Sequence, residues 1–570
     1  MQKFTSIPIQ DDSTNFEERA DYLSESEIND WSIDSKYAEA ILKKLLQIGA
    51  KLIAGPRGTG KTHYMRKAYF LAKKNADGPF ALYISFNHYL RLESFLHKKS
   101  NALNIFHSWV LAKIMVHLLD EHNLELNDEH SSINLSSLQK FVTQVEKQQY
   151  NEEFNIILNT LSIELVQQYI LKATLKYGRK RAILLFDDAA LTLNSDYMIE
   201  FFDIFRSLKS SHISPKASVY PGTTQFGPRF HIGQDAERIL IWQDVQKNEY
   251  LDFMKDFRRK RFPDLIIDEN IDSLLIYASF GMPRTYLNLL RSYLTQKESS
   301  SNDQSIFNKL LSDQTTYCLE EYRSISKKLI QYNEFIETGE NLFNLILNDL
   351  KEANHQEWDL SNKEEYSRRV IYAFDDLEPE NATNTRILNF LEEAGLLYRL
   401  PPVSHGPDRK LQRFVPHYAF ILHKKVLTKD RGFDKDWLVQ KLSSRPSKKQ
   451  PIRKRLNTLL LDIGIPSLSL PPCHSCETPR LATTQVYCHQ CGSKLVNQST
   501  FEICMKYSLT ELPLTNFQKK VLQDSSFQTV EDVIVTTDVG RKLREQPRVG
   551  IQRSTHIHKT IETWVNEFLV

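Results

Sequence analysis

Eight consecutive residues have the types and the spacing needed to hold a polyphosphate. They are Gly55, Pro56, Arg57, Gly58, Thr59, Gly60, Lys61 and Thr62. Glycines let the backbone curve around an anion, so that its N–H groups and the N-terminus of a following helix point at a phosphate. In this pattern we expect Lys61 to reach the β- and γ-phosphates and Thr62 to place its hydroxyl on Mg²⁺.

The segments beside this loop fit the same chemistry. Residues 51–54 are mostly apolar and predict a buried strand, and residues 63–72 lack proline and glycine and predict a helix. Strand, glycine loop and helix is the context of the phosphate-binding loop, or Walker A motif, of P-loop NTPases. The alternative is a glycine turn with an incidental lysine. We predict an ATP or GTP site, with cofactor-binding residues Gly55, Arg57, Gly58, Thr59, Gly60, Lys61 and Thr62.

Two acids follow a second apolar run. Residues 182–186 predict a buried strand, and Asp187 and Asp188 come directly after it. The carboxyl ends of strands in α/β sheets are where ligands bind. This is a Walker B pattern, in which we expect Asp187, with Thr62, to hold Mg²⁺, largely through water. The alternative is a strand end with two solvated acids.

Further strands and helices complete the expected core and its lid. Residues 217–224 and 238–242 predict two more strands, in addition to one at 80–86. Phe280 to Arg284 opens a predicted helix over 285–294. Long helical patterns cover 104–119 and 157–177, where apolar residues recur three and four positions apart.

From about Ser35 to Leu294 the order of these motifs resembles AAA+ ATPases of the origin-recognition and initiator type, and the related STAND signalling NTPases. The resemblance implies a catalytic role for Asp188, Thr223 and Arg284 beside Asp187. Asp188 stands where AAA+ enzymes usually have the glutamate that polarises the attacking water. Since aspartate is one methylene shorter, hydrolysis is expected to be slow. The paired acids are closer to the STAND pattern than to the initiator pattern.

The resemblance also assigns two sensors. Thr223, with Thr224 as the alternative, corresponds to sensor 1, and Arg284 corresponds to the sensor 2 arginine that reaches the γ-phosphate from the lid. A nucleotide-dependent homo-oligomer would need an arginine finger from a neighbouring subunit. Arg229, Arg258 and Arg259 all remain open for that role.

The segment after the lid resembles the second half of a winged helix. Residues 298–312 read as a polar linker and 317–353 as helical. A helix at 385–394, a strand at 396–400, a turn and a strand at 411–415 follow. Cations on or near the wing could hold backbone phosphates. They are Arg399, Arg409, Lys410 and Arg413. The alternative is a winged helix used for protein contacts.

A basic stretch follows. Residues 441–455 carry seven cations and no acid, and Pro446 and Pro451 predict an irregular linker. The cations are Lys441, Arg445, Lys448, Lys449, Arg453, Lys454 and Arg455. From Arg431 onward there are 20 basic and 13 acidic residues, against 53 and 58 in the rest. Such an excess suits an anionic partner, although charged runs are often only solvated.

Four of the six cysteines form two C-x-x-C pairs separated by eleven residues, Cys473 with Cys476 and Cys488 with Cys491. Four thiolates on two tight turns complete a closed tetrahedral shell around Zn²⁺, so the predicted zinc site is structural. The pattern resembles a short zinc ribbon. The two remaining cysteines, Cys318 and Cys504, each stand alone and are expected to be plain buried residues.

The C-terminal segment resembles a helix-hairpin-helix domain, in which a glycine turn aims backbone N–H groups at a DNA phosphate. Residues 547–551 precede a predicted helix at 554–568. Arg548 replaces the first glycine of that family, and only Gly550 matches. A small helical bundle for protein association is the alternative.

These patterns predict a multi-domain protein with an α/β P-loop core (35–245) after an N-terminal arm (1–34). A helical lid (246–300), a helical and winged-helix domain (301–430), a basic linker (431–470), a zinc ribbon (471–500) and an all-α domain (501–570) follow. The hydrophobic content of 41% is ordinary for a soluble protein. No apolar run near the roughly 18 residues of a membrane span and no signal-peptide core is apparent, so we expect a cytoplasmic protein.

The expected function is ATP binding, with hydrolysis, in a protein that binds double-stranded DNA with low sequence specificity through its C-terminal modules. ATP, Mg²⁺ and Zn²⁺ are the expected cofactors. The alternative is a STAND-like switch in defence or signalling that recruits a separate effector protein, because no nuclease, protease or deaminase pattern is visible in the chain.

Overall fold

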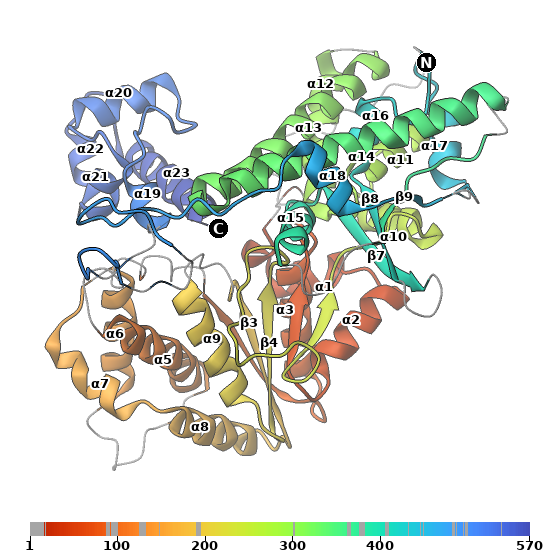
Figure 1. Cartoon of the computed structure of the whole chain (residues 1–570). Helices are drawn as coiled ribbons and strands as arrows, with labels where there is room; N and C mark the ends of the chain where they lie inside the picture. The colour runs from red at the N-terminus through yellow and green to blue at the C-terminus, as the bar shows by residue number, and fades with distance from the viewer. Residues whose placement is uncertain are drawn as a thin grey trace.

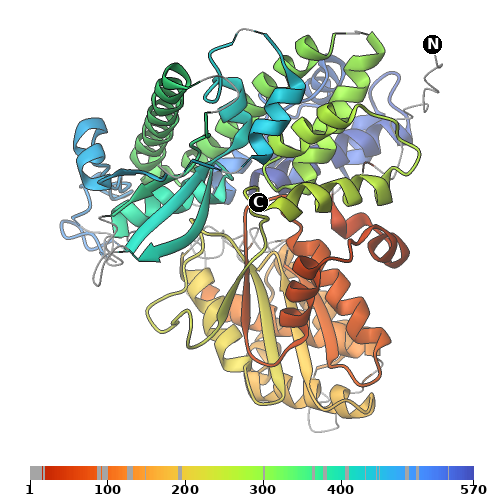
Figure 2. The same ribbon diagram turned by 90° about the vertical axis from the view of Figure 1, so that its right-hand side faces the viewer.

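The structure is a computed structural model of the whole chain (Figure 1). It describes residues 16, 19–86, 92, 101–122, 124, 133–147, 149–189, 195–299, 302–361, 366–375, 382–404, 410–430, 432–444, 446–447, 450–481, 485, 487–493, 495, 500–536 and 538–569. An α/β core forms one half of the molecule, and the lid, a second sheet and the C-terminal helices lie above it in Figure 2.

The core is built on a five-stranded parallel sheet in the order β2-β3-β4-β1-β5. The strands are β1 (Lys51–Ala54), β2 (Phe80–Ser85), β3 (Ala182–Asp187), β4 (Ile213–Val219) and β5 (Glu237–Leu240). The strand after the Walker B acids, β4, lies between β1 and β3, as the sensor 1 assignment requires. A parallel sheet in which the phosphate loop follows a central strand is the α/β P-loop core that the sequence predicts.

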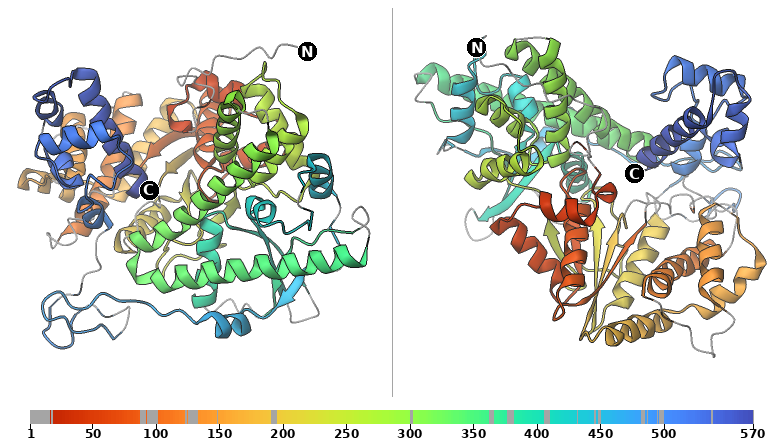
Figure 3. Two further views of the ribbon diagram at one scale, coloured as in Figure 1. Left: turned by 90° about the horizontal axis from the view of Figure 1, so that it is seen from above. Right: turned by 180° about the vertical axis from the view of Figure 1, so that it is seen from behind.

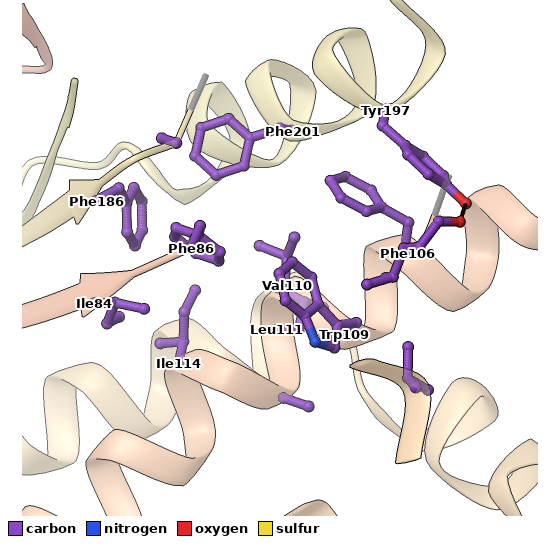
Figure 4. Packing of buried hydrophobic residues seen from close by; sticks show 14 of the residues in the cluster. Ile84, Phe86, Phe106, Trp109, Val110, Leu111, Ile114, Phe186, Tyr197 and Phe201 are labelled. Carbon is purple, nitrogen blue, oxygen red and sulfur yellow. Dashed lines mark hydrogen bonds between the residues drawn. The ribbon is translucent and has the colours of Figure 1, made fainter. Parts of the chain in front are cut away.

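Helices cover both faces of this sheet (Figure 1). One face packs on α2 (Lys36–Leu46) and α3 (Lys61–Lys74), and the other on α5 (Ala102–His122), α8 (Ile163–Lys176) and α9 (Ser195–Leu208). Alternate strand residues point to opposite faces. Thus Ile183 and Leu185 pack toward α3, whereas Leu184 and Phe186 join the larger cluster (Figure 4).

Helix α5 corrects one expectation from the sequence. It is long and apolar enough, by length and composition, to cross a membrane. However, 67% of its most apolar window is buried inside the protein, where Trp109 and Ile114 pack near Phe86 of the sheet edge (Figure 4). Its Lys113 is also buried and lies 3.4 Å from Glu146. The packing is that of a core helix.

A second correction concerns residues 157–177, which form two helices and not one. The neighbouring elements are α6 (Leu135–Glu146), η5 (Glu152–Phe154), α7 (Asn155–Thr160) and then α8. Ser162 separates α7 from α8, because its side chain accepts a hydrogen bond from the backbone N–H of Leu165 and so caps α8.

The described part of the N-terminal arm is folded against the core. It contains η2 (Ala20–Tyr22) and α1 (Glu25–Trp31), and both contact α3. The Arg66 guanidinium of α3 donates to the carbonyl of Leu23 at 2.7 Å. Ile28 of α1 is fully buried with Phe70 of α3. The polar composition of this segment gave no sign of that packing.

The lid is helical, as predicted, and continues directly into two long helices. It comprises α10 (Asn248–Arg261), α11 (Glu269–Ala278) and α12 (Pro283–Ser299), followed by α13 (Asp303–Lys328), η6 (Ile330–Tyr332) and α14 (Asn333–Leu360). The polar stretch 298–312 is therefore mostly helix, which corrects the predicted linker. Asn302 caps α13 by accepting a hydrogen bond from Ser305 N–H, and every third or fourth residue of α13, such as Ile306 and Leu310, is buried.

A second sheet follows, with strand order β7-β8-β6-β9. Its strands are β6 (Tyr372–Phe374), β7 (Leu397–Ser404), β8 (Lys410–Pro416) and β9 (Ile452–Lys454), and its helices are α15 (Ala382–Glu393), α16 (Tyr418–His423), α17 (Lys435–Ser443) and α18 (Leu456–Ile463). The helix, strand, turn and strand predicted for a winged helix are present in that order.

The basic stretch is part of this sheet rather than an irregular linker throughout. Its residues 452–454 form β9, which pairs in parallel with β6, and Lys441 belongs to α17. Lys441 is buried and donates to the carbonyl of Tyr366 at 2.8 Å, so it is not a surface cation. Arg453, Lys454 and Arg455 are exposed, whereas Arg445, Lys448 and Lys449 lie outside the described residues.

Five helices end the chain, and they gather apart from the lid in both views of Figure 3. They are α19 (Thr500–Met505), α20 (Asn516–Asp524), α21 (Val530–Val535), α22 (Val539–Arg544) and α23 (Ile551–Leu569). The ammonium of Lys328, at the end of α13, lies over the ring of Phe568 of α23 at 5.9 Å. The C-terminal segment is all-α, as predicted.

Candidate nucleotide site and cysteine cluster

The loop between β1 and α3 has the backbone that its glycines predict. Gly58 and Gly60 have φ angles of 78° and 94°, in the left-handed region that favours glycine. A Cβ added to Gly55 would lie 2.5 Å from the carbonyl oxygen of Ile241. Gly60 immediately precedes α3, which begins at Lys61, so the helix N-terminus points at the space enclosed by the loop.

Lys61 lies inside the loop. Its Nζ donates to the carbonyls of Gly55 at 2.6 Å and Pro56 at 3.0 Å, and lies 4.1 Å from the ring centre of Tyr220. Burial lowers the pKa of Lys61 to about 7, although the neighbouring Asp187 raises it. A polyphosphate at this position would restore the preference for the charged form, because an anion beside a cation stabilises it.

The two acids of β3 lie together with Thr62. Asp187 is buried, accepts a hydrogen bond from the Tyr83 hydroxyl at 2.8 Å and is hydrogen-bonded to Thr62. A hydroxyl and a carboxylate side by side are oxygen ligands of the kind that Mg²⁺ takes. Burial raises the pKa of Asp187, and hydrogen bonds from Tyr83 and Thr62 oppose that rise.

Asp188 follows directly after the end of β3 in an uncommon conformation. Its φ is 54°, and its backbone N–H donates to Oδ1 of Asp187 at 3.0 Å. Burial, together with the adjacent Asp187, raises the pKa of Asp188 to about 7. Asp188 and Lys61 both line the cavity described next.

A cavity of about 270 Å³ opens beside the loop. Its lining includes residues 57–62 with Asp188 and Arg284, together with apolar and aromatic side chains. The apolar and aromatic members include Tyr37, Leu42, Phe253, Phe257 and Leu287. A lining that combines cations and glycines with apolar side chains suits a phosphate chain attached to a flat base.

Two arginines support this fit. Arg57 Nη2 and Arg284 Nε are buried and have no hydrogen-bond partner among the described residues. Burying an unpaired donor costs free energy, which a phosphate oxygen would offset. Arg284 is also close to the loop, because its N–H donates to the Gly58 carbonyl at 3.4 Å and a Cβ on Gly58 would lie 3.0 Å from its Cβ. The structure therefore brings the predicted lid arginine to the predicted loop.

Comparison with known proteins adds little to this geometry. No protein family matches the chain, and no curated protein matches it. Among solved structures, the Aeropyrum pernix ORC1 protein in complex with DNA is similar over 70% of this chain and 94% of its own, with 12% sequence identity and a TM-score of 0.27. A similarity of this size does not establish a shared fold.

The sequence did not predict that the N-terminal segment would line the cavity. Arg19, Asp21, Trp31 and Ile33 all contribute to the wall. Asp21 lies near the paired acids, where its charge raises the pKa of Asp187 and Asp188. No local motif marks these residues, because their placement depends on the packing of α1 on α3.

The sensor 1 candidates have different surroundings. Thr224 Oγ1 accepts a hydrogen bond from the Tyr220 N–H at 2.9 Å and so closes the turn after β4. The Thr223 hydroxyl donates to Oε1 of Glu393 at 2.9 Å. Glu393, at the end of α15, was not predicted, and no signal near it in the sequence connects it with a residue 170 positions away.

The three candidates for an arginine finger are all paired within the chain. Arg229 forms an ion pair with Asp203, and Arg259 lies 3.1 Å from Asp256. Both are exposed. Arg258 is buried inside the lid and its Nε lies 3.1 Å from Asp272. Because Arg258 is buried, its side chain is part of the packing of α10 on α11.

The four cysteines of the predicted zinc site come together. The Sγ atoms of Cys473, Cys476, Cys488 and Cys491 all lie within 4.8 Å of one another. Neighbouring sulfurs are 3.5 Å apart for Cys473 and Cys491, and 3.6 Å apart for Cys476 and Cys488. Four sulfurs at such separations can surround one Zn²⁺ at about 2.3 Å from each.

The two cysteine turns have the same backbone. Glu477 N–H donates to the Cys473 carbonyl at 2.7 Å, and Gly492 N–H donates to the Cys488 carbonyl at 2.9 Å. Glu477 and Gly492 both have positive φ angles, 56° and 71°. These matched turns present the thiols from two sides, so the donor set fits a structural zinc ion.

Two cations on the predicted wing are engaged within their own module. Arg399 Nε lies 2.7 Å from Glu392, and Arg413 donates to the Pro401 carbonyl at 2.9 Å. Lys410 is exposed, and Arg409 lies outside the described residues.

The turn before α23 holds the predicted hairpin residues. Arg548, which stands at the position expected for the first hairpin glycine, has a φ of 66°, a conformation that favours glycine. Gly550 does not have a positive φ.

Proposed function

We propose that this chain is a Mg²⁺-dependent ATP-binding protein of the AAA+ type. The observation that carries the proposal is the juxtaposition of Lys61 and Thr62 with Asp187 at the carboxyl edge of a parallel sheet. In this assignment Lys61 and the loop N–H groups hold the phosphates, and Thr62 and Asp187 hold Mg²⁺. Bound Mg²⁺ would neutralise charge on the phosphate oxygens.

We assign hydrolysis to Asp188, with Thr223 and Arg284 as the sensors. A water held between Asp188 and the γ-phosphate would lose its proton to the carboxylate. The short aspartate side chain gives a reason for a slow rate. GTP is the alternative nucleotide, because the aromatic side chains in the cavity lining could stack on either base.

The proposed nucleic-acid partner is double-stranded DNA, bound through the second sheet, the zinc ribbon and the C-terminal helices. Exposed cations on β9 and after it support this assignment, namely Arg453, Lys454 and Arg455. Cations of this kind hold phosphates and do not read bases, so sequence specificity should be low. Nucleotide would control the conformation or assembly of the chain.

A second candidate is a STAND-like switch that recruits an effector protein. The observation that favours it is the internal pairing of Arg399 and Arg413, which takes two cations of the predicted wing away from an external anion. A winged helix with its cations so paired suits protein contacts. DNA binding by the full-length chain discriminates between the two candidates.

The experiment measures the affinity for a fluorescent duplex at several salt concentrations, with ATP and Mg²⁺ present. Changing Arg453, Lys454 and Arg455 together to Gln should flatten the slope of log affinity against log salt by about 0.9 for each phosphate that is no longer neutralised. A matched control changes Lys172, Lys176 and Lys180 of the core to Gln and should leave the slope unchanged. No binding at low salt would favour the switch.

A further inference from the structure

A carboxylate from the second sheet's module is fixed beside the nucleotide site. Glu393, the last residue of α15, accepts hydrogen bonds from the N–H groups of Gly222 and Thr223, both at 2.7 Å, and from the Thr223 hydroxyl at 2.9 Å. Three donors directed at one side chain set its position closely. They belong to the turn after β4, which is the central strand between the two Walker strands.

The contact is close as well as polar. A Cβ added to Gly222 would lie 2.7 Å from the ring of Phe390 and 3.0 Å from the backbone of Asn389, so α15 leaves no room at this turn. Just after the end of α15, a Cβ on Gly395 would lie 3.9 Å from the Cβ of Pro56 in the phosphate loop. The end of α15 therefore packs against both the sensor turn and the loop.

Glu393 lines a second cavity, of about 240 Å³, that shares a wall with the nucleotide cavity. Four residues line both cavities: Arg57, Gly58, Tyr220 and Arg284. The charge of Glu393 acts on Lys61, and that of Arg57 acts on Glu393. The carboxylate is thus in the same electrostatic environment as the cations that would hold the terminal phosphate.

This arrangement has a chemical consequence. A γ-phosphate held by Lys61 would bring added negative charge toward the fixed carboxylate, whereas ADP ends one phosphate earlier. Like charges brought close together in a partly buried site repel each other more strongly than they do in water. Burial also raises the pKa of Glu393, although the bonds from Thr223 and Gly222 oppose the rise.

We propose that Glu393 is a specificity-determining residue that makes the site favour ADP over ATP while α15 is docked. The proposal rests on the nucleotide-binding function proposed above. The coupling between nucleotide binding and the docking of α15 is reciprocal, because a ligand that binds better when a contact is broken also weakens that contact. ATP would loosen α15 and the sheet that follows it, whereas ADP would leave them docked.

The test compares the dissociation constants of ADP and of the slowly hydrolysed analogue ATPγS, each with Mg²⁺, in the full-length chain. Glu393→Gln keeps the shape and one acceptor oxygen but removes the charge. It should strengthen ATPγS binding relative to ADP by about tenfold or more, which corresponds to about 1.4 kcal/mol, with ADP binding changed less than about twofold. Glu393→Ala should act in the same direction if the glutamine variant folds poorly.

The matched control is Glu392→Gln, one residue earlier. Glu392 pairs with Arg399 and lies 3.5 Å from Arg238 of β5, so it also helps to hold α15 on the core sheet, without touching the sensor turn. This variant should therefore shift the ratio of the two constants severalfold less than Glu393→Gln does. An equal shift in both variants would show general loosening and overturn the proposal.

Three other results would overturn it. An unchanged ratio in both Glu393 variants, in a wild-type protein that binds both nucleotides, would remove this inference and leave the nucleotide site standing. A loss of turnover with an unchanged ratio would instead assign Glu393 to water activation. If the wild type binds neither nucleotide, the proposed function fails and this inference fails with it.

Discussion

The Tyr83 hydroxyl donates a 2.8 Å hydrogen bond to Oδ2 of Asp187. The two residues lie on neighbouring strands, since β2 pairs with β3 in a register that places Ser85 opposite Asp187. Tyr83 therefore orients the carboxylate that we assign to Mg²⁺. Hydrogen bonds to a metal-binding carboxylate commonly set its orientation and its affinity.

Removing that bond should weaken Mg²⁺ binding. Tyr83→Phe should raise the Mg²⁺ concentration needed for half-maximal ATP binding or turnover by about tenfold or more. Titrating Mg²⁺ against a fluorescent ATP analogue measures the effect. Tyr293→Phe is the control, because Tyr293 donates a similar bond to Asp303 in the helical region. An unchanged Mg²⁺ requirement in the Tyr83 variant would remove Asp187 from the metal site.

The cysteine cluster predicts about one Zn²⁺ per purified chain. Cys491→Ser should lower the zinc content severalfold, because it breaks the four-thiolate shell, while ATP binding persists. Metal analysis by mass spectrometry measures both proteins. Cys318→Ala removes a buried cysteine outside the cluster and should keep the metal. Equal zinc in the Cys491 variant and the wild type would contradict the assignment.

His417 predicts a loss of stability in acid. Its ring is fully buried against Phe280, at 4.7 Å between ring centres, and its Nδ1 accepts a hydrogen bond from the Ala419 N–H at 3.1 Å. Burial lowers the pKa of His417 to about 3. In the unfolded chain the His417 ring takes up a proton near pH 6.5, whereas in the folded chain it stays neutral until the pH nears 3. The stability that neutral His417 contributes to the fold is therefore complete above pH 6.5 and declines as the pH falls toward 3.

His417→Asn keeps a capping acceptor but cannot take up a proton in this range. Between pH 7 and pH 5 the wild type should lose about 2 kcal/mol more of its free energy of unfolding than this variant does. Urea denaturation at the two pH values measures the difference. The exposed His212, changed to Asn, should not alter the pH dependence. The same pH dependence in the wild type and the His417 variant would show that His417 is protonated in the folded state.

The sequence was informative where chemistry and local structure depend on neighbouring residues. The glycine loop, the apolar strand before Asp187 and the two C-x-x-C turns each carry their own signal within about ten residues. Their meeting in space follows from the parallel sheet, which brings the ends of β1 and β3 to one edge. The two cysteine pairs lie on turns with the same local hydrogen bond, and their four sulfurs lie within 4.8 Å of one another.

What could not be predicted depends on contacts between distant segments. The hydrogen bond that the Thr223 hydroxyl, in the turn after β4, donates to Glu393 joins residues 170 positions apart. The pairing of residues 452–454 with β6 turns a stretch with two prolines into part of a sheet. The polar residues 303–312 form helix because α13 buries one side, which tertiary packing decides and composition does not.

Direct binding of ATP to the full-length protein, with Mg²⁺ present, tests the central claim most directly. The wild type and Lys61→Ala are titrated with a fluorescent ATP analogue. Lys73→Ala, at the other end of α3, serves as the control. We predict saturable binding in the wild type and the control, and a loss of at least about a hundredfold in the Lys61 variant, whose fold should be intact by circular dichroism. Equal ATP affinity in all three proteins would contradict the nucleotide site.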